Sequence, residues 1–227
     1  MAQKLIKIKM SDIAFAYRSA FQPEHTVFSN LNAVFETGAL NIIVGKSGSG
    51  KTTLLRLLAG REKAQSGSIT YSPSSLKETT YFLSNLDESY FFSQTLREER
   101  GLCLEQGADT DFFQIPGITD KILDTPLQHL SDGYRRLARI AIALWSGAST
   151  LLLDEPLNTL DFFFRNKLRF ILEKLAMRGK LIIIATHDYD IYTKNRANFV
   201  ELTNGKITGF SPKKKYYHYI KELANAQ

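Results

Sequence analysis

One nine-residue stretch limits the fold of this chain more than any other feature. Residues 45–53 match the phosphate-binding pattern G-x-x-x-x-G-K-[ST] at every required position. The apolar run at 40–44 predicts a buried strand before it, and residues 53–60 predict a helix that closes at a glycine. This order predicts a loop that wraps a nucleoside triphosphate. Its residues are Gly45, Lys46, Ser47, Gly48, Ser49, Gly50, Lys51, Thr52 and Thr53.

The residue types of this loop suit a polyphosphate. Glycines let successive backbone N–H groups point at phosphate oxygens, and the N-terminus of the following helix adds its positive dipole end. Lys51 supplies a full charge, and the hydroxyl of Thr52 is a ligand for Mg²⁺. The alternative is a glycine-rich turn that carries a lysine by chance, and the flanking strand and helix argue against it.

Composition narrows the class of protein. With 227 residues, 44% of them hydrophobic, the chain can bury one sizeable core, with or without a small inserted subdomain. The formal charge of +6 suits polyphosphate ligands or an anionic membrane surface and does not demand nucleic acid. Cys103 has no partner for an internal disulfide, which favours the reducing cytoplasm. We expect a soluble chain, because the apolar runs are far shorter than the ~20 residues of a membrane span.

Alternating apolar residues and turn signals predict a β-rich first third. Strands are predicted at 4–10, 13–17, 27–31, 33–36, 65–71 and 79–83. Tyr17 ends the strand-like run at 13–17 and is expected where the chain passes between strands, as a half-buried aromatic or as a ring that stacks on a nucleotide base. Residues 86–130 lose the alternation and predict an inserted, mainly helical subdomain. Its predicted helices are 95–100 and 120–123, with breaks at Gly101, Gly107, Pro116, Gly117 and Pro126.

Acidic and histidine side chains follow two apolar strands in the second half of the chain. The strand at 149–153 ends in Asp154 and Glu155, and the strand at 180–185 is followed by Thr186 and His187. The carboxyl ends of parallel strands form the ligand-binding edge of a sheet. Carboxylates beside a polyphosphate handle a cation or a proton, so we expect Asp154 to associate with Mg²⁺ and Glu155 to polarise water. His187 is either an ordinary polar surface or capping residue or, because it follows a strand at the same edge as Asp154, a group that contacts the transferring phosphate.

Four further segments complete the prediction from the sequence. Ser131 is a candidate N-cap for a helix at 134–144, and Asp161 for a helix ending at Gly179. The pattern at 199–208 predicts a β-hairpin. The basic, aromatic tail predicts a helix with either a solvated face or a contact to a membrane surface or partner.

The motifs together, in this order, resemble the nucleotide-binding subunit of ATP-binding cassette transporters. The resemblance implies an α/β fold: a P-loop NTPase core with an N-terminal antiparallel β subdomain and an inserted α-helical subdomain. It implies that residues 45–53 are the Walker A loop and Asp154 the Walker B acid. By the same resemblance, Glu155 is the catalytic base, His187 the switch histidine and Tyr17 the aromatic that stacks on adenine. Asp161 matches the D-loop.

The resemblance covers nearly the whole chain as one ATPase domain. It divides the chain into a β-rich and Walker A part (1–85), a helical subdomain (86–130), a part with the signature, Walker B and switch (131–210) and a basic C-terminal helix (211–227). Family members form head-to-tail dimers, so Ser131 and Gly133 are expected to contact the ATP of a second subunit. The resemblance further implies ATP and Mg²⁺ as cofactors, transmembrane partner subunits, and a cytoplasmic site, peripheral on the inner face of the cell membrane.

Two segments of the chain depart from the family pattern. The signature, usually Leu-Ser-Gly-Gly-Gln, has Asp132 in place of a glycine and Tyr134 in place of the glutamine. A carboxylate facing a γ-phosphate would be repelled, which favours a heterodimer with a second cassette subunit. The glutamine expected after the strand at 79–83 is missing, and Asn85 is the candidate replacement as a ligand near Mg²⁺.

The leading hypothesis is an ATPase that energises transport of an unidentified substrate across a membrane. A regulatory, weakly hydrolysing cassette is a second reading, because of Asp132 and Asn85. A nucleic-acid-associated cassette is the third and is disfavoured, because the chain has neither long coiled coils nor a second cassette.

Overall fold

Two β-sheets organise the residues that the computed structural model describes, namely 6–19, 22–84, 91–105, 115, 117–158, 160–192 and 197–209. The smaller sheet is antiparallel, in the order β2-β1-β4, and the larger has the order β5-β6-β7-β3-β8-β9. All neighbours in the larger sheet are parallel except β8 and β9. The strands are β1 (Lys7–Ser19), β2 (Gln22–Glu36), β3 (Leu40–Val44), β4 (Ser66–Ser72), β5 (Thr80–Leu83), β6 (Thr150–Asp154), β7 (Leu181–Thr186), β8 (Ala197–Thr203) and β9 (Lys206–Gly209).

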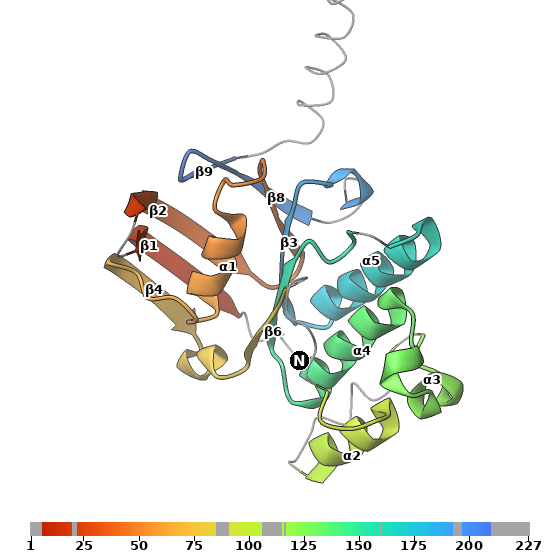
Figure 1. The fold of residues 1–227 in the computed structure, drawn as a ribbon. Coiled ribbons are helices and arrows are strands. Elements are labelled where there is room, and N and C mark those ends of the chain that lie inside the picture. The colour runs from red at the N-terminus through yellow and green to blue at the C-terminus, as the bar shows by residue number, and fades with distance from the viewer. Residues whose placement is uncertain are drawn as a thin grey trace, which may run out of the picture.

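The helices lie on both sides of the larger sheet. Figure 1 shows α1 beside the smaller sheet, with α4 and α5 across the larger sheet and α2 and α3 beyond α4. Apolar residues of α1 share a core with both sheets, so α1 is packed between them. The helices are α1 (Lys51–Leu58), α2 (Leu96–Glu105), α3 (Asp120–Asp124), α4 (Asp132–Trp145) and α5 (Phe162–Met177).

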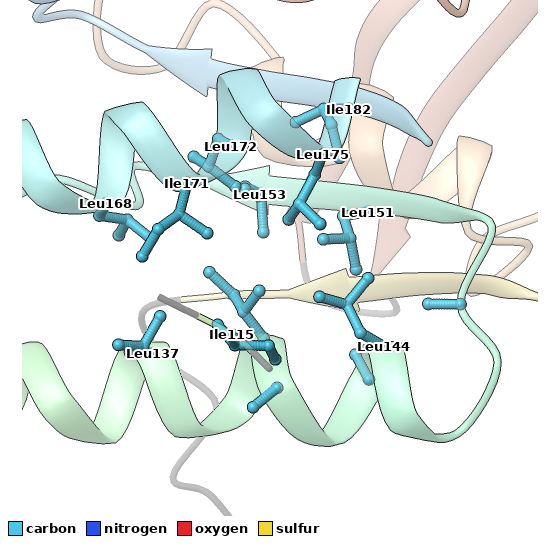
Figure 2. Packing of buried hydrophobic residues seen from close by; sticks show 14 of the residues in the cluster. Ile115, Leu137, Leu144, Leu151, Leu153, Leu168, Ile171, Leu172, Leu175 and Ile182 are labelled. Atoms are coloured by element: carbon cyan, nitrogen blue, oxygen red, sulfur yellow. The ribbon is translucent and has the colours of Figure 1, made fainter. Parts of the chain in front are cut away.

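The central strands bury both faces in two separate cores. Successive side chains of a strand point to opposite faces. In β7, Ile182 and Ile184 therefore pack with α4 and α5, whereas Ile183 packs with α1 and the smaller sheet. Figure 2 shows the first of these cores, where leucines of α4 and α5 meet side chains of β6 and β7. Continuous apolar strands of this kind are typical of a parallel sheet covered on both faces. Packing on both faces fixes the positions of these strands, and with them the residues at their carboxyl ends.

Side-chain caps define where α4 and α5 begin, as the sequence predicts. Ser131 Oγ accepts a hydrogen bond from the Tyr134 N–H at 3.5 Å, and Asp161 Oδ1 accepts one from the Phe164 N–H at 2.8 Å. Each cap satisfies a backbone donor that the first turn of a helix leaves without a partner.

The structure corrects several local predictions. Tyr17 lies inside β1, opposite His25, rather than between strands, and residues 27–36 form part of one strand instead of two. The predicted early strands also merge into β1, with a register shift beside Asp12, whose φ is +51°. Gly101 lies inside α2 instead of ending a helix, because burial of Leu96 and Cys103 outweighs the ~1 kcal/mol that a helical glycine costs.

Some predictions fall on parts of the chain outside the described residues. These are Asn85, the breaks at Gly107 and Pro116, and the basic tail at 211–227. Within the described residues, no helix combines the length and apolar character needed to cross a membrane.

Candidate active site

Three parallel strands bring the predicted site residues to one edge of the larger sheet. The pairing register places Val44 opposite Thr186, and Asp154 opposite Ala185. The loop that follows β3, the acids that end β6 and the histidine after β7 therefore converge. This edge is where an open parallel sheet binds its ligands.

Steric contacts explain two glycines of the loop between β3 and α1. Gly50 caps α1 with a φ of +98°, a conformation that side chains disfavour. A Cβ atom on Gly45 would lie 2.6 Å from the carbonyl oxygen of Leu202 in β8. Glycine at these two positions therefore allows the close packing and the backbone conformation of the loop.

Lys51 is folded back onto the loop that carries it. Its Nζ donates hydrogen bonds to the carbonyl oxygens of Gly45 at 2.8 Å and Lys46 at 3.1 Å. Burial lowers the pKa of Lys51, and the carboxylates of Glu155 and Asp154 oppose that decrease. The ammonium group is therefore held at the centre of the loop, where phosphate oxygens would be stronger acceptors than neutral carbonyls.

Thr52 and Asp154 form a hydrogen-bonded pair of side chains. The Thr52 hydroxyl donates to Asp154 Oδ2 at 2.6 Å. Burial raises the pKa of Asp154, while the hydrogen bond from Thr52 opposes the rise. Among the described residues no group of three or more histidine, cysteine or acidic side chains could hold a metal alone. The pair instead suits an ion such as Mg²⁺, which binds one or two protein oxygens together with water and substrate phosphates.

The carboxylate of Glu155 is fixed by two neighbours from the end of β7. Its Oε2 accepts the Thr186 hydroxyl at 2.9 Å. Its Oε1 accepts the His187 backbone N–H at 3.1 Å and lies 2.8 Å from His187 Nδ1. Sequence reasoning gave Thr186 no role, and the signal that could have found it is its place beside His187 at the strand end. A carboxylate held in this way is oriented for work on a proton or a water molecule.

An open groove of about 700 Å³ runs along the predicted site residues. Tyr17 lies in its wall, where its hydroxyl is 3.2 Å from Thr53 Oγ1 and its ring packs edge-on against Phe15. Stacking of Tyr17 on adenine stays a prediction. Sequence reasoning missed four residues of the wall, namely His25, Val27, Ser84 and Asn158. The other lining residues include the phosphate loop from Lys46 to Gly48, residues 50–53, Asp154, Glu155 and His187.

Comparison with known proteins identifies the family. The sequence profile described as "ABC transporter" matches residues 28–158, which is more than half of the chain. The chain belongs to the ABC transporter family. It is 31% identical over 216 residues to the energy-coupling factor transporter ATP-binding protein EcfA1 of Thermotoga maritima, and the match covers 89% of this chain and 80% of that protein. The chain is therefore an ABC ATPase subunit, which binds and hydrolyses ATP to energise transport.

Solved ABC cassettes confirm the predicted fold class. The structure of cbiO1 from Clostridium perfringens superposes with a TM-score of 0.78 at 21% identity, covering 96% of this chain and 93% of that one. A dimeric bacterial ABC transporter cassette, MJ0796, superposes with a TM-score of 0.72 at 20% identity, covering 89% of this chain and all of that one. The P-loop core with its antiparallel sheet and added helices is thus the fold of this family.

The signature segment of this ABC cassette lies at the start of α4, and neither Ser131 nor Gly133 is among the described residues that line the groove. Gly133 is buried, and a Cβ atom there would lie 2.7 Å from the ring of Phe164. Tyr134 packs edge-on against the same ring, with centroids 4.8 Å apart. Asp132 forms an ion pair with Arg135, which holds the pKa of Asp132 below its usual value. The departures from the family signature therefore have partners within the chain.

Proposed function

We propose that the groove binds ATP together with Mg²⁺ and that the chain hydrolyses it at the edge of the larger sheet. Lys51 and the backbone N–H groups of residues 45–50 would hold the phosphates. Thr52 and Asp154 would hold the ion, since their oxygens already lie 2.6 Å apart. The chemistry of the bound ion would be to neutralise charge on the phosphate oxygens.

The fixed carboxylate of Glu155 is the observation that carries this proposal. Thr186 and His187 hold its two oxygens at distances of 2.8 to 3.1 Å. We assign Glu155 the role of base that accepts a proton from the attacking water. His187 both orients Glu155 and stands at the groove, where it could contact the transferring phosphate. Tyr17 is assigned to the base of the nucleotide, on the basis of its place in the groove wall.

Transport across a membrane requires transmembrane subunits as partners of an ABC ATPase subunit. We propose that two cassettes associate head to tail, so that Ser131 and Gly133 of one subunit meet the ATP held by the other. The MJ0796 cassette is a dimer, and cbiO1 is described as part of the transporter complex cbiONQ. By analogy the chain would act in the cytoplasm, against transmembrane subunits at the inner face of the cell membrane. Asn85 is retained as a proposed ligand near Mg²⁺.

The test is Glu155→Gln, which keeps the shape of the side chain and removes its basicity. We expect the turnover of ATP to fall by roughly 10² or more, while binding of ATP is retained. The variant should also accumulate an ATP-bound dimer, visible by size-exclusion chromatography. Glu78→Gln is the matched control, because Glu78 is exposed and does not line the groove. Normal turnover in Glu155→Gln would show that another group is the base.

A further inference from the structure

Arg136 of α4 reaches the backbone that carries the catalytic carboxylate. Its Nη1 donates to the carbonyl oxygen of Glu155 at 3.1 Å and to that of Pro156 at 2.7 Å. Both carbonyls belong to the turn that follows β6, beyond the last ladder partner of that strand. Half-buried carbonyls outside a ladder need a donor from elsewhere, and a guanidinium supplies a charge-assisted one.

The backbone at Glu155 has a conformation that needs support. Its φ is +48°, in the left-handed region that non-glycine residues occupy at a cost of about 1 kcal/mol or more. The Glu155 N–H donates to the carbonyl oxygen of Ala185 at 2.8 Å, which holds one side of the residue. Arg136 holds the other side, through the Glu155 carbonyl. The residue is therefore fixed from β7 and from α4 at once.

Arg136 lies partly buried beside a second arginine of α4, Arg139. Arg136 and Arg139 line a small hollow beside Asp154 and Pro156, and Arg139 donates to the carbonyl oxygen of Ser84 at 3.5 Å. Burial, followed by repulsion from Arg139, lowers the pKa of Arg136, and Asp132 opposes that decrease. Two arginines of α4 thus donate hydrogen bonds to backbone carbonyls that follow the neighbouring strands β5 and β6.

We propose that Arg136 is a positioning residue for Glu155, which acts through the backbone and links the signature helix to the hydrolysis site of its own chain. The inference rests on the proposed role of Glu155 as the base. Arg136 lies in the second turn of α4, and Ser131 and Gly133 lie at the start of the same helix. A tilt of α4, such as contact with a second subunit would cause, would move the guanidinium and with it the Glu155 backbone.

The test compares three variants of the purified chain. Arg136→Met removes the hydrogen-bond donors, whereas Arg136→Lys keeps a charge and a donor. Arg178→Met, at an exposed arginine, is the matched control. We expect Arg136→Met to lower kcat by about 10-fold, because small displacements of a catalytic group have effects of this order or larger. The equilibrium affinity for ATP should change by less than about 2-fold, since Arg136 lies outside the phosphate loop. Arg136→Lys should recover part of the loss, and Arg178→Met should match the unmutated chain.

A double variant distinguishes positioning from general damage. If Arg136 acts through Glu155, adding Arg136→Met to Glu155→Gln should cause little further loss of turnover. An unchanged kcat in Arg136→Met would overturn the inference. So would losses of similar size with and without Glu155→Gln, or equal losses of kcat and ATP affinity, because each indicates a structural role. Normal turnover in Glu155→Gln alone would instead overturn the proposed function.

Discussion

The edge of the larger sheet and the start of α4 both carry motif residues of the family, but different partners hold their side chains. At the sheet edge, site residues hold one another: Thr52 bonds to Asp154, and His187 to Glu155. At the start of α4, the partners lie outside the motifs. Asp132 pairs with Arg135, and the ring of Tyr134 packs against Phe164 and lies below Lys167.

This difference bears on how a substitution would act in each region. A substitution at the sheet edge would remove a partner from another site residue, and the remaining polar group would lie partly buried without its hydrogen bond. A substitution at the start of α4 can be balanced by a neighbour on the helix surface. The signature of this chain is therefore altered in two residues while its helix remains capped and packed.

Replacing the charge at the centre of the phosphate loop should have the largest effect. Lys51→Ala should weaken ATP binding on the order of 100-fold, because charged hydrogen bonds of about 2 to 3 kcal/mol are lost. Titration with a fluorescent ATP analogue measures this change. Lys63→Ala, at an exposed lysine outside the groove, is the control. Affinity equal to that of the unmutated chain would show that the groove does not bind ATP through this loop.

A methyl group at Gly133 should have an intermediate effect, on stability. In Gly133→Ala the new Cβ would lie 2.7 Å from the Phe164 ring, which now packs edge-on against Tyr134, so this packing must change. Overpacking of this kind costs about 1 to 3 kcal/mol of unfolding free energy, which urea denaturation measures. Gly101→Ala is a matched control inside α2, where nothing lies within 4 Å of the new atom, and it should stabilise the chain by up to ~1 kcal/mol. Equal stability of the two variants would contradict the packing argument.

Removing the unusual carboxylate of the signature should have the smallest effect. Asp132→Gly should raise ATP-dependent self-association by about 3-fold or less, because Arg135 already neutralises part of the charge in an exposed pair. Arg135→Gln leaves the carboxylate unpaired and should lower self-association by a similar factor. Sedimentation equilibrium in a Glu155→Gln background measures both variants without loss of ATP. A gain in Arg135→Gln would show that Asp132 is not the obstacle to homodimers.

Much of the sheet edge could be predicted because its signals are local. The phosphate loop is one continuous motif, and apolar runs that end in Asp154 or precede His187 mark the ends of buried parallel strands. The N-caps Ser131 and Asp161 could also be predicted, since an N-cap side chain bonds to a backbone N–H within three residues. These signals require no knowledge of the rest of the fold.

The contacts that could not be predicted join segments that are distant in the sequence. Arg136 reaches Glu155 across 19 positions, and an arginine on an amphipathic helix ordinarily indicates only a solvated face. Gly101 was misread as a helix end because its intrinsic preference was weighed without the buried neighbours in α2. Thr186 acquires its role only when β6 and β7 lie side by side.

The hairpin of β8 and β9 packs against the loop between β3 and α1 and also covers one side of β3. The carbonyl of Leu202 closes the space above Gly45, and Gly205 in the turn closely approaches the backbone at Val27. β8 also shields the free side of β3. Without this hairpin, β3 would become an exposed edge, whose unpaired backbone groups invite aggregation with other chains. The hairpin therefore shields β3 from such association while it packs against the loop that begins at Gly45.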